Sequence, residues 1–253
     1  MEKRGQLTIF IIIAVVIVAL GIAVYFFSPQ IKTGFGATTN NPSLFMQSCI
    51  KSNIESSVNT ISSQGGSVNP EHYFLINDEK IEYLCYTDEY YVPCVMQQPL
   101  LKQHIETEIK NDISAEVNSC FDSLKKSFES QAYIVNLVRG NTTVELVPGK
   151  VEVTFNNDLT LTKTGTERYE KIVVDLDNNL YELVSIANSI LNIEAQYGDS
   201  ETTTYMDYYH NIKVEKNKQG DGSKIYILTN RDMGNKFQFA TRSVAWPPGI
   251  GQW

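Results

Sequence analysis

The longest apolar run of the chain lies near its beginning. Residues 7–27, LTIFIIIAVVIVALGIAVYFF, contain no charged side chain. A helix of this length rises about 31 Å, which is close to the hydrocarbon thickness of a bilayer. The run ends in Tyr25, Phe26 and Phe27 and is followed by Pro29, as at an aromatic belt and a helix stop. A cleaved secretory signal usually has a shorter apolar region, so the pattern predicts a retained transmembrane helix over residues 7–27.

The charges on either side of this segment predict its orientation. Lys3 and Arg4 precede the segment, and only Lys32 follows it closely. Because positive residues collect on the cytoplasmic side, residues 1–6 are predicted to be a cytoplasmic stub. Residues 28–40 contain Pro, Gly, Thr and Asn and are interpreted as a linker. We therefore expect a single-pass protein of the cell membrane whose C-terminal region is extracytoplasmic.

Three later segments repeat apolar residues at helical spacing. The first begins with Asn41 as N-cap and Pro42, and it ends at Gly65-Gly66. The second is predicted as one long helix from Pro99 to about Phe128, and the third covers residues 178–196. The apolar positions of the first helix are Met46, Ile50, Ile54, Val58 and Ile61, and those of the second are Leu101, Ile105, Ile109, Ile113, Val117, Phe121 and Leu124.

The rest of the pattern is β-branched alternation interrupted by turn residues. Gly140-Asn141 and residues 156–158 are interpreted as hairpin turns. The predicted fold class is α+β, with one N-terminal transmembrane helix followed by a disulfide-stapled extracytoplasmic region containing antiparallel sheet. A helix-rich subdomain over residues 41–130 is expected to precede a β-rich subdomain with one helix over residues 131–253. The predicted strands cover residues 73–76, 80–87, 90–95, 135–139, 143–147, 150–155, 160–164, 167–175, 208–216, 224–229 and 236–242.

Four cysteines follow the apolar segment, at positions 49, 85, 94 and 120. An even number outside the cytoplasm indicates two disulfides, for which three connectivities are open. Cys49 and Cys120 lie on or beside the apolar stripes of the first two helices, and Cys85 and Cys94 flank a reversal of the chain. We therefore favour the pairs Cys49 with Cys120 and Cys85 with Cys94. The absence of C-x-x-C spacing argues against a structural zinc site or a thioredoxin-like pair.

The net charge of the chain argues against one class of partner. The chain has 29 acidic and 21 basic residues, for a net charge of −8. Nucleic-acid binding depends on Lys and Arg contacts to phosphate, so this balance argues against a nucleic-acid partner. The lipid bilayer, through residues 7–27, and a protein or glycan outside the cell are the partners we expect. Nothing in the sequence indicates an oligomeric state.

The sequence contains few residues in patterns typical of metal-binding or catalytic sites. Asp175, Asp177 and Asn179 resemble the start of a calcium loop, but Leu180 and Ile186 stand where such a loop needs Gly and Glu. Asp and Asn before a helix are more simply N-cap residues. His72, His104 and His210 are scattered and are expected at the surface or half-buried. No P-loop, G-x-S-x-G or dinucleotide motif is present, so we predict no catalytic site, no metal and no cofactor.

Aromatic residues supply the candidate binding surface. Fourteen tyrosines are present, and Tyr86, Tyr90 and Tyr91 cluster at the predicted cysteine hairpin. Such side chains serve glycan or protein binding surfaces and also ordinary strands. The apolar, proline-containing C-terminus with Trp246 and Trp253 is expected to pack back or to dock a partner. Asn141 is in an N-x-[ST] sequon and is a candidate glycosylation site.

The residues before the apolar run resemble a known type of signal sequence. Lys3, Arg4, Gly5 and Gln6 followed by the apolar run resemble the class III, prepilin-type signal of archaeal surface proteins. The resemblance implies a cut between Gly5 and Gln6 that leaves the apolar helix on the mature chain. Many pilins have Glu five residues into the mature chain, and this sequence has Phe10 there. The layout also resembles uncharacterised single-span proteins of small-genome archaea, which implies no known activity.

Three hypotheses for the function remain open from the sequence, and two of them are principal. The first is a membrane-anchored surface protein that serves binding, adhesion or envelope structure, and we favour it because of Phe10. The alternative is a type IV pilin-like subunit whose N-terminal helices bundle in a filament. An extracytoplasmic enzyme is a third and less favoured hypothesis.

Overall fold

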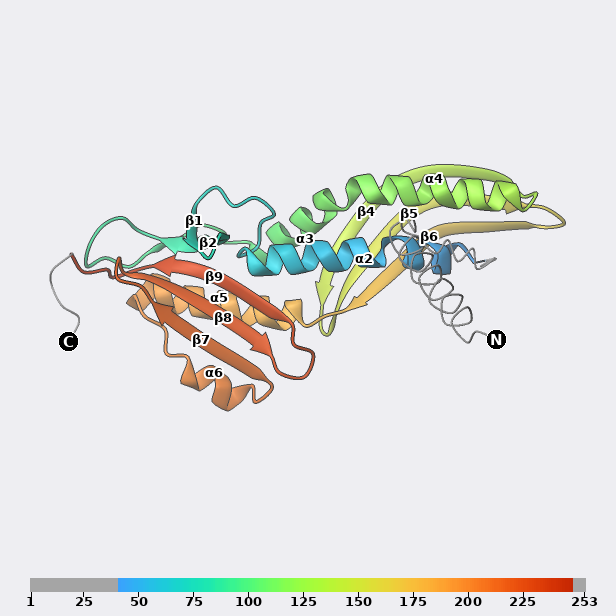
Figure 1. The fold of residues 1–253 in the computed structure, drawn as a ribbon. Helices are drawn as coiled ribbons and strands as arrows, with labels where there is room; N and C mark the ends of the chain where they lie inside the picture. Colours follow the sequence, from blue (N-terminus) through green and yellow to red (C-terminus); the bar gives the residue numbers. More distant parts are fainter. Residues whose placement is uncertain (1–40, 248–253) are drawn as a thin grey trace, which may run out of the picture. The chain divides into compact units, whose positions relative to one another are not determined.

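The computed structural model describes residues 41–247 (Figure 1). This part of the chain has an α+β fold with two disulfides, as predicted. The predicted transmembrane helix at residues 7–27 lies outside the described residues. None of the helices within residues 41–247 has the length and apolarity needed to cross a membrane.

Three strands form an antiparallel sheet in the order β4-β5-β6. They are β4 (Ile134–Val147), β5 (Lys150–Thr162) and β6 (Thr166–Asp177). Alternate residues of β5 point into the core, because a strand turns successive side chains to opposite faces. The fully buried apolar residues of this strand are Val151, Val153, Phe155, Leu159 and Leu161.

The two hairpin turns predicted inside this sheet are wrong. Gly140-Asn141 lies in an irregularity within the continuous strand β4, and residues 156–158 lie in a second one within β5. A Cβ on Gly140 would lie 2.2 Å from the carbonyl oxygen of Asn156. The glycine therefore permits a close approach of two strands, which is the other common role of glycine in a sheet.

Three helices cover one face of this sheet: α2 (Pro42–Ser63), α3 (Leu101–Asp112) and α4 (Ser114–Ser130) (Figure 1). The predicted N-cap of α2 is confirmed, since Asn41 Oδ1 accepts from Ser43 N at 2.9 Å. The predicted single helix from Pro99 is divided at Ile113. Asn111 and Asp112 precede this break, and short polar side chains compete with helical hydrogen bonding.

The Cys49–Cys120 disulfide joins α2 to α4, with 5.9 Å between the two Cα atoms. The predicted pairing is confirmed. Both helices turn apolar faces to the same core, which includes Met46, Ile50, Val117 and Phe121. The bond therefore links two helices that hydrophobic packing already holds together.

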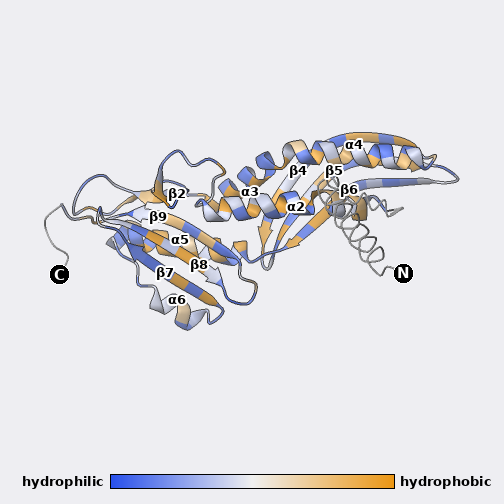
Figure 2. Ribbon diagram, in the orientation of Figure 1, coloured by the Kyte–Doolittle hydropathy of each residue, from blue (hydrophilic) through white to orange (hydrophobic). Residues whose placement is uncertain are grey.

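The second sheet is mixed, in the order β1-β2-β9-β8-β7, with β3 pairing to β2. Its strands are β1 (Tyr73–Ile76), β2 (Glu79–Tyr86), β3 (Val95–Met96), β7 (Ile212–Lys218), β8 (Ser223–Asn230) and β9 (Lys236–Arg242). Hydrophobic and hydrophilic residues alternate at the start of β7, whose last residues are all hydrophilic (Figure 2). The expected antiparallel pairing is present, and the parallel pairing of β2 with β9, which the sequence pattern does not predict, makes this sheet mixed.

Two strand predictions in this region also differ from the structure. Residues 90–94 are irregular, and only β3 remains of the expected return strand. A short helix, α6 (Thr203–Tyr208), replaces the start of the strand predicted from Tyr208. Tyrosine favours strands only where it can pack on a pleated surface, and Tyr208 is exposed instead.

The helix α5 (Leu180–Tyr197) contacts strands of both sheets. Its buried residues, including Leu183, Ala187 and Ile190, belong to one apolar core that also contains residues of α2 and α4. Residues 41–130 and 131–247 thus share this core, and β2 and β9 pair across the expected boundary. The division into two subdomains stays a prediction.

Candidate functional site

Residues 87–94 form a short surface loop between β2 and β3, which we call the aromatic loop. The Cys85–Cys94 disulfide closes it, with 5.4 Å between the two Cα atoms, as predicted. Both cysteines are buried. The disulfide therefore fixes the ends of a loop whose middle, with Tyr90 and Tyr91, is exposed.

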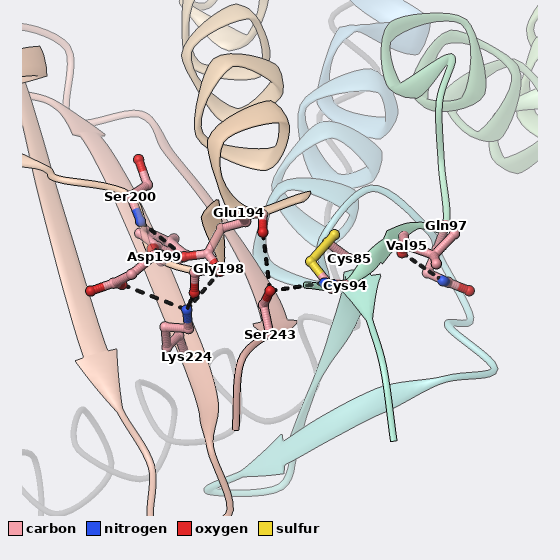
Figure 3. Close-up of a disulfide and its surroundings, with 11 residues drawn as sticks. Cys85, Cys94, Val95, Gln97, Glu194, Gly198, Asp199, Ser200, Lys224 and Ser243 are labelled. Atoms are coloured by element: carbon pink, nitrogen blue, oxygen red, sulfur yellow. Dashed lines mark hydrogen bonds and ion pairs between the residues drawn. A yellow bond between two sulfur atoms is a disulfide. The ribbon is translucent and has the colours of Figure 1, made fainter. Parts of the chain in front are cut away.

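A second segment of the chain, residues 243–247, runs beside this loop. Val244 N donates to Val92 O at 2.8 Å, and Tyr91 N donates to Ala245 O at 3.0 Å. Cys94 N donates to Ser243 Oγ at 2.8 Å, and Figure 3 shows this contact next to the disulfide. The loop is consequently held both by a covalent bond and by backbone hydrogen bonds to the segment that follows β9.

Two residues of this region have left-handed backbone conformations without being glycine. Tyr91 has a φ of 64° and Val244 a φ of 49°. A positive φ in a β-branched residue is a genuine outlier, and such strain costs on the order of 1–3 kcal/mol per residue. Such strain persists only where contacts with the surrounding structure stabilise the unfavourable conformation. Residues of this kind are concentrated at functional sites.

Arg242 contacts the aromatic loop from its buried side. Its guanidinium donates to Thr87 O and, at 3.1 Å, to Asp221 O. The guanidinium carbon lies 5.9 Å from the ring centroid of Tyr86 and 5.5 Å from that of Tyr90, which are cation–π distances. Because Arg242 is itself almost fully buried, it positions the tyrosines and leaves their outer faces for contact.

Tyr86 also belongs to a second ring cluster on β2. His72 lies 4.2 Å from Tyr86 between ring centroids, and Tyr83 lies 5.0 Å from it. The Tyr83 hydroxyl hydrogen-bonds Ser223 Oγ at 2.7 Å, and burial raises the pKa of this phenol. Tyr83 is thus buried and uncharged, whereas Tyr86 is half-buried.

The exposed side chains of this region form what we call the aromatic surface. They are Tyr90, Tyr91, Val92 and Trp246, with exposed fractions of 42%, 51%, 36% and 47%. The rings of Tyr91 and Trp246 meet edge to face at 4.8 Å between centroids. Rigid aromatic side chains of this kind are enriched in interfaces and in the residues that dominate their affinity.

A buried ion pair supports the aromatic loop (Figure 3). Ser243 Oγ, which accepts from Cys94 N, donates to Glu194 O at 3.0 Å. The Glu194 carboxylate, fully buried, accepts from Lys224 Nζ at 2.6 Å and from the Tyr226 hydroxyl. Burial and the Glu194 charge raise the pKa of Tyr226 far above its ordinary range. Lys224 also donates to Gly198 O, so its ammonium links the C-terminal end of α5 to β8.

A polar cluster lies elsewhere, between α2, β2 and α3. The buried Ser67 Oγ lies 2.6 Å from a Glu82 carboxylate oxygen and 2.8 Å from His104 Nε2. Burial raises the pKa of Glu82, and the hydrogen bond from Ser67 opposes this rise. When the Ser67 hydroxyl donates to Glu82, its hydrogen is not available to His104. In this arrangement the cluster ties the segment after Gly65-Gly66 to β2 and α3.

The remaining predicted residues do not join the aromatic surface. Asn141 is exposed on a strand, not in a hairpin turn, and its Oδ1 accepts from Lys110 Nζ at 3.1 Å. Gly5, Gln6 and Trp253 lie outside the described residues. The helix α5 is capped by Asn178, whose Oδ1 accepts from Leu180 N, rather than by Asn179. Within residues 41–247 no group of His, Cys, Asp or Glu is arranged to hold a metal.

The tyrosines, Trp246 and the disulfide of this site are predictable from the sequence, whereas Arg242 and Ser243 are not. A single Arg-Ser pair after a strand has no distinctive spacing. Both residues reach the loop only because β9 pairs with β2 across more than 150 positions of the chain. No protein-family model matches the sequence, and comparison with curated proteins and with solved structures gives no match.

Proposed function

We propose that the chain is a single-span surface protein whose extracytoplasmic region binds a protein partner through the aromatic surface. The observation that carries this proposal is Tyr91, half-exposed against Trp246 on a backbone with positive φ. A strained aromatic residue held outward by a disulfide, an arginine and backbone hydrogen bonds is pre-organised for contact. Pre-organisation reduces the entropy lost on binding.

Location outside the cytoplasm is supported by the two disulfides. Disulfides persist in oxidising environments and are rare in reducing ones. The uncharged run at residues 7–27, preceded by Lys3 and Arg4, supports a membrane anchor with its N-terminus in the cytoplasm. Processing between Gly5 and Gln6 is part of the proposal, on the resemblance to prepilin-type signals.

A protein partner is favoured over a glycan by the composition of the surface. Val92 extends the apolar area beside the two tyrosines and Trp246. Sugar hydroxyls need polar side chains to receive and donate hydrogen bonds, whereas an apolar exposed patch is typical of protein contacts. Two exposed carboxylates of the same loop, Asp88 and Glu89, would favour a protein partner with basic side chains at this place.

Binding to isolated cell envelopes of the source organism tests this function. The purified full chain in mild detergent is expected to sediment saturably with envelopes. Tyr91→Ser and Trp246→Ser are each expected to weaken binding about tenfold, because hot-spot residues contribute roughly 1–2 kcal/mol or more. Tyr197→Ser is the matched control, since Tyr197 is 75% exposed and lies on α5. Equal binding by all three variants would overturn the proposal.

The pilin-like alternative is separated by fractionation. A mature chain that begins at Gln6 and occurs in sheared filaments would favour a filament subunit. A chain recovered only from detergent-extracted membranes would favour the anchored surface protein.

A further inference from the structure

A cleft lies between the first half of α5 and α6, separate from the aromatic surface. It has a volume of about 440 Å³. Residues from α5, from α6 and from the connection to β7 line it. Three of these residues are tyrosines, Tyr181, Tyr205 and Tyr209, and Glu182 is the only Asp, Glu, Lys, Arg or His among the described lining residues.

The aromatic lining is fixed in part by a hydrogen bond. The Tyr205 hydroxyl lies 2.9 Å from Ser189 Oγ, which joins α6 to α5 across the cleft. Tyr181 and Tyr205 are half-buried against the apolar core. Packing and this hydrogen bond thus hold two of the three tyrosines in the lining, and the faces of aromatic rings carry negative electrostatic potential.

Glu182 adds an incompletely satisfied carboxylate. One of its oxygens, Oε1, accepts from Gly149 N at 2.9 Å. The other, Oε2, is buried and has no hydrogen-bond partner among the described residues. Lys150, adjacent to Gly149, forms ion pairs with Glu152 and Asp175 instead. Glu182 as a whole is half-buried, and a carboxylate oxygen that is shielded from water and has no hydrogen-bond partner is costly.

We propose that this cleft binds an organic ammonium group. A cation is attracted both by the faces of aromatic rings and by the charge of the half-buried Glu182. An anion would be repelled by the same groups. A neutral ligand would leave the charge of Glu182 uncompensated. The ammonium is supplied either by a quaternary amine or by a primary amine such as a lysine side chain.

Saturation-transfer NMR on the full chain in mild detergent tests the proposal, with choline as the quaternary probe and n-butylammonium as the primary one. The neutral control is 3,3-dimethylbutan-1-ol, which has the shape of choline without its charge. Saturation transfer to at least one cation, with little transfer to the neutral alcohol, is expected. The cation with the larger effect identifies the source of the ammonium. Equal transfer to choline and the alcohol, or none to either cation, would overturn the proposal.

Matched variants locate the binding. Glu182→Gln keeps an oxygen for Gly149 N but removes the charge, and it should weaken binding at least tenfold. Tyr205→Leu removes the ring and should weaken it severalfold, while Tyr205→Phe keeps the ring and should bind nearly as well as the wild type. Glu145→Gln makes the same charge change at an exposed site on β4 and should have no effect. Unchanged thermal melting shows that each variant is folded, and Glu182→Gln binding as tightly as the wild type would contradict the assignment.

Discussion

The two disulfides connect regions of different character. Cys49–Cys120 joins two helices whose apolar faces pack in the core, and it spans 71 positions of the chain. Cys85–Cys94 spans 9 positions and closes a loop with exposed rings and a residue of positive φ. The first bond reinforces contacts that the hydrophobic effect already favours. The second holds a conformation that the backbone alone disfavours.

A disulfide can therefore stabilise a fold or fix the shape of a surface. In the chain-entropy account, a long closed loop gives more stabilisation than a short one. A short loop gives less stability but restricts the directions of a few side chains. We therefore expect the two bonds to respond differently when each is removed, in stability for one and in surface geometry for the other.

The largest effect is expected when the core disulfide is removed. The double change Cys49→Ser and Cys120→Ser should lower the free energy of unfolding by about 4 kcal/mol, because the loop is long. For a chain of this size this corresponds to a fall in Tm of roughly 8–16 °C. Thermal unfolding followed by circular dichroism measures it. A change below about 1 kcal/mol would remove the stabilising role assigned to this bond.

Removal of the loop disulfide should have a smaller effect on stability and a larger one on the surface. The double change Cys85→Ser and Cys94→Ser is expected to cost about 2–3 kcal/mol. The loop would then lose its fixed end, so Tyr91 would move away from Trp246. Fluorescence of Trp246, in a Trp253→Phe background, reports the change of environment. An unaltered spectrum would mean that hydrogen bonds alone hold the loop.

Ser243→Ala probes the link between the loop and the buried ion pair. The variant leaves Cys94 N without its acceptor and removes the donor to Glu194 O. We expect a loss of about 1–3 kcal/mol, because a buried backbone donor becomes unsatisfied. Hydrogen exchange of the Cys94 amide should accelerate, whereas amides of β5 should exchange as in the wild type. Equal acceleration in both places would point to global destabilisation.

The smallest effect concerns the cluster around Glu82 and depends on pH. Burial raises the pKa of Glu82 above its ordinary value of 4.5, so the folded state holds this proton more tightly than the unfolded state. Its contribution to stability is therefore full below pH 4.5 and is lost as the pH rises through the folded pKa. Glu82→Gln should show a weaker fall in stability over that range. Urea unfolding from pH 4 to 7 measures the two slopes, with Glu145→Gln as the control, and identical slopes would contradict the assigned shift.

Much of this fold could be predicted where the signal is local. Asn41 at the start of α2 and the apolar stripes that place Cys49 opposite Cys120 follow from helix chemistry alone. Gly140 was misinterpreted because glycine permits both turns and close strand approach, and only the neighbouring strand decides between them. The parallel pairing of β2 with β9 could not be predicted, since it joins residues far apart in the chain.

The same contrast applies to the candidate site. Tyr90, Tyr91 and Trp246 were identified by their aromatic side chains and their position near the cysteines or the C-terminus. The roles of Arg242 and of the strained Val244 depend on contacts that no local pattern encodes. The conformation of the loop is set by its surroundings, so a single sequence could indicate its composition but not its shape.

Envelope binding by the two disulfide variants, measured at a temperature where both are folded, separates the roles of the two bonds. If the Cys85–Cys94 disulfide shapes the binding surface, its double serine variant should bind cell envelopes at least tenfold more weakly than the wild type. The Cys49 and Cys120 double serine variant, although less stable, should bind with the wild-type dissociation constant. Equal dissociation constants for the two variants would contradict the account.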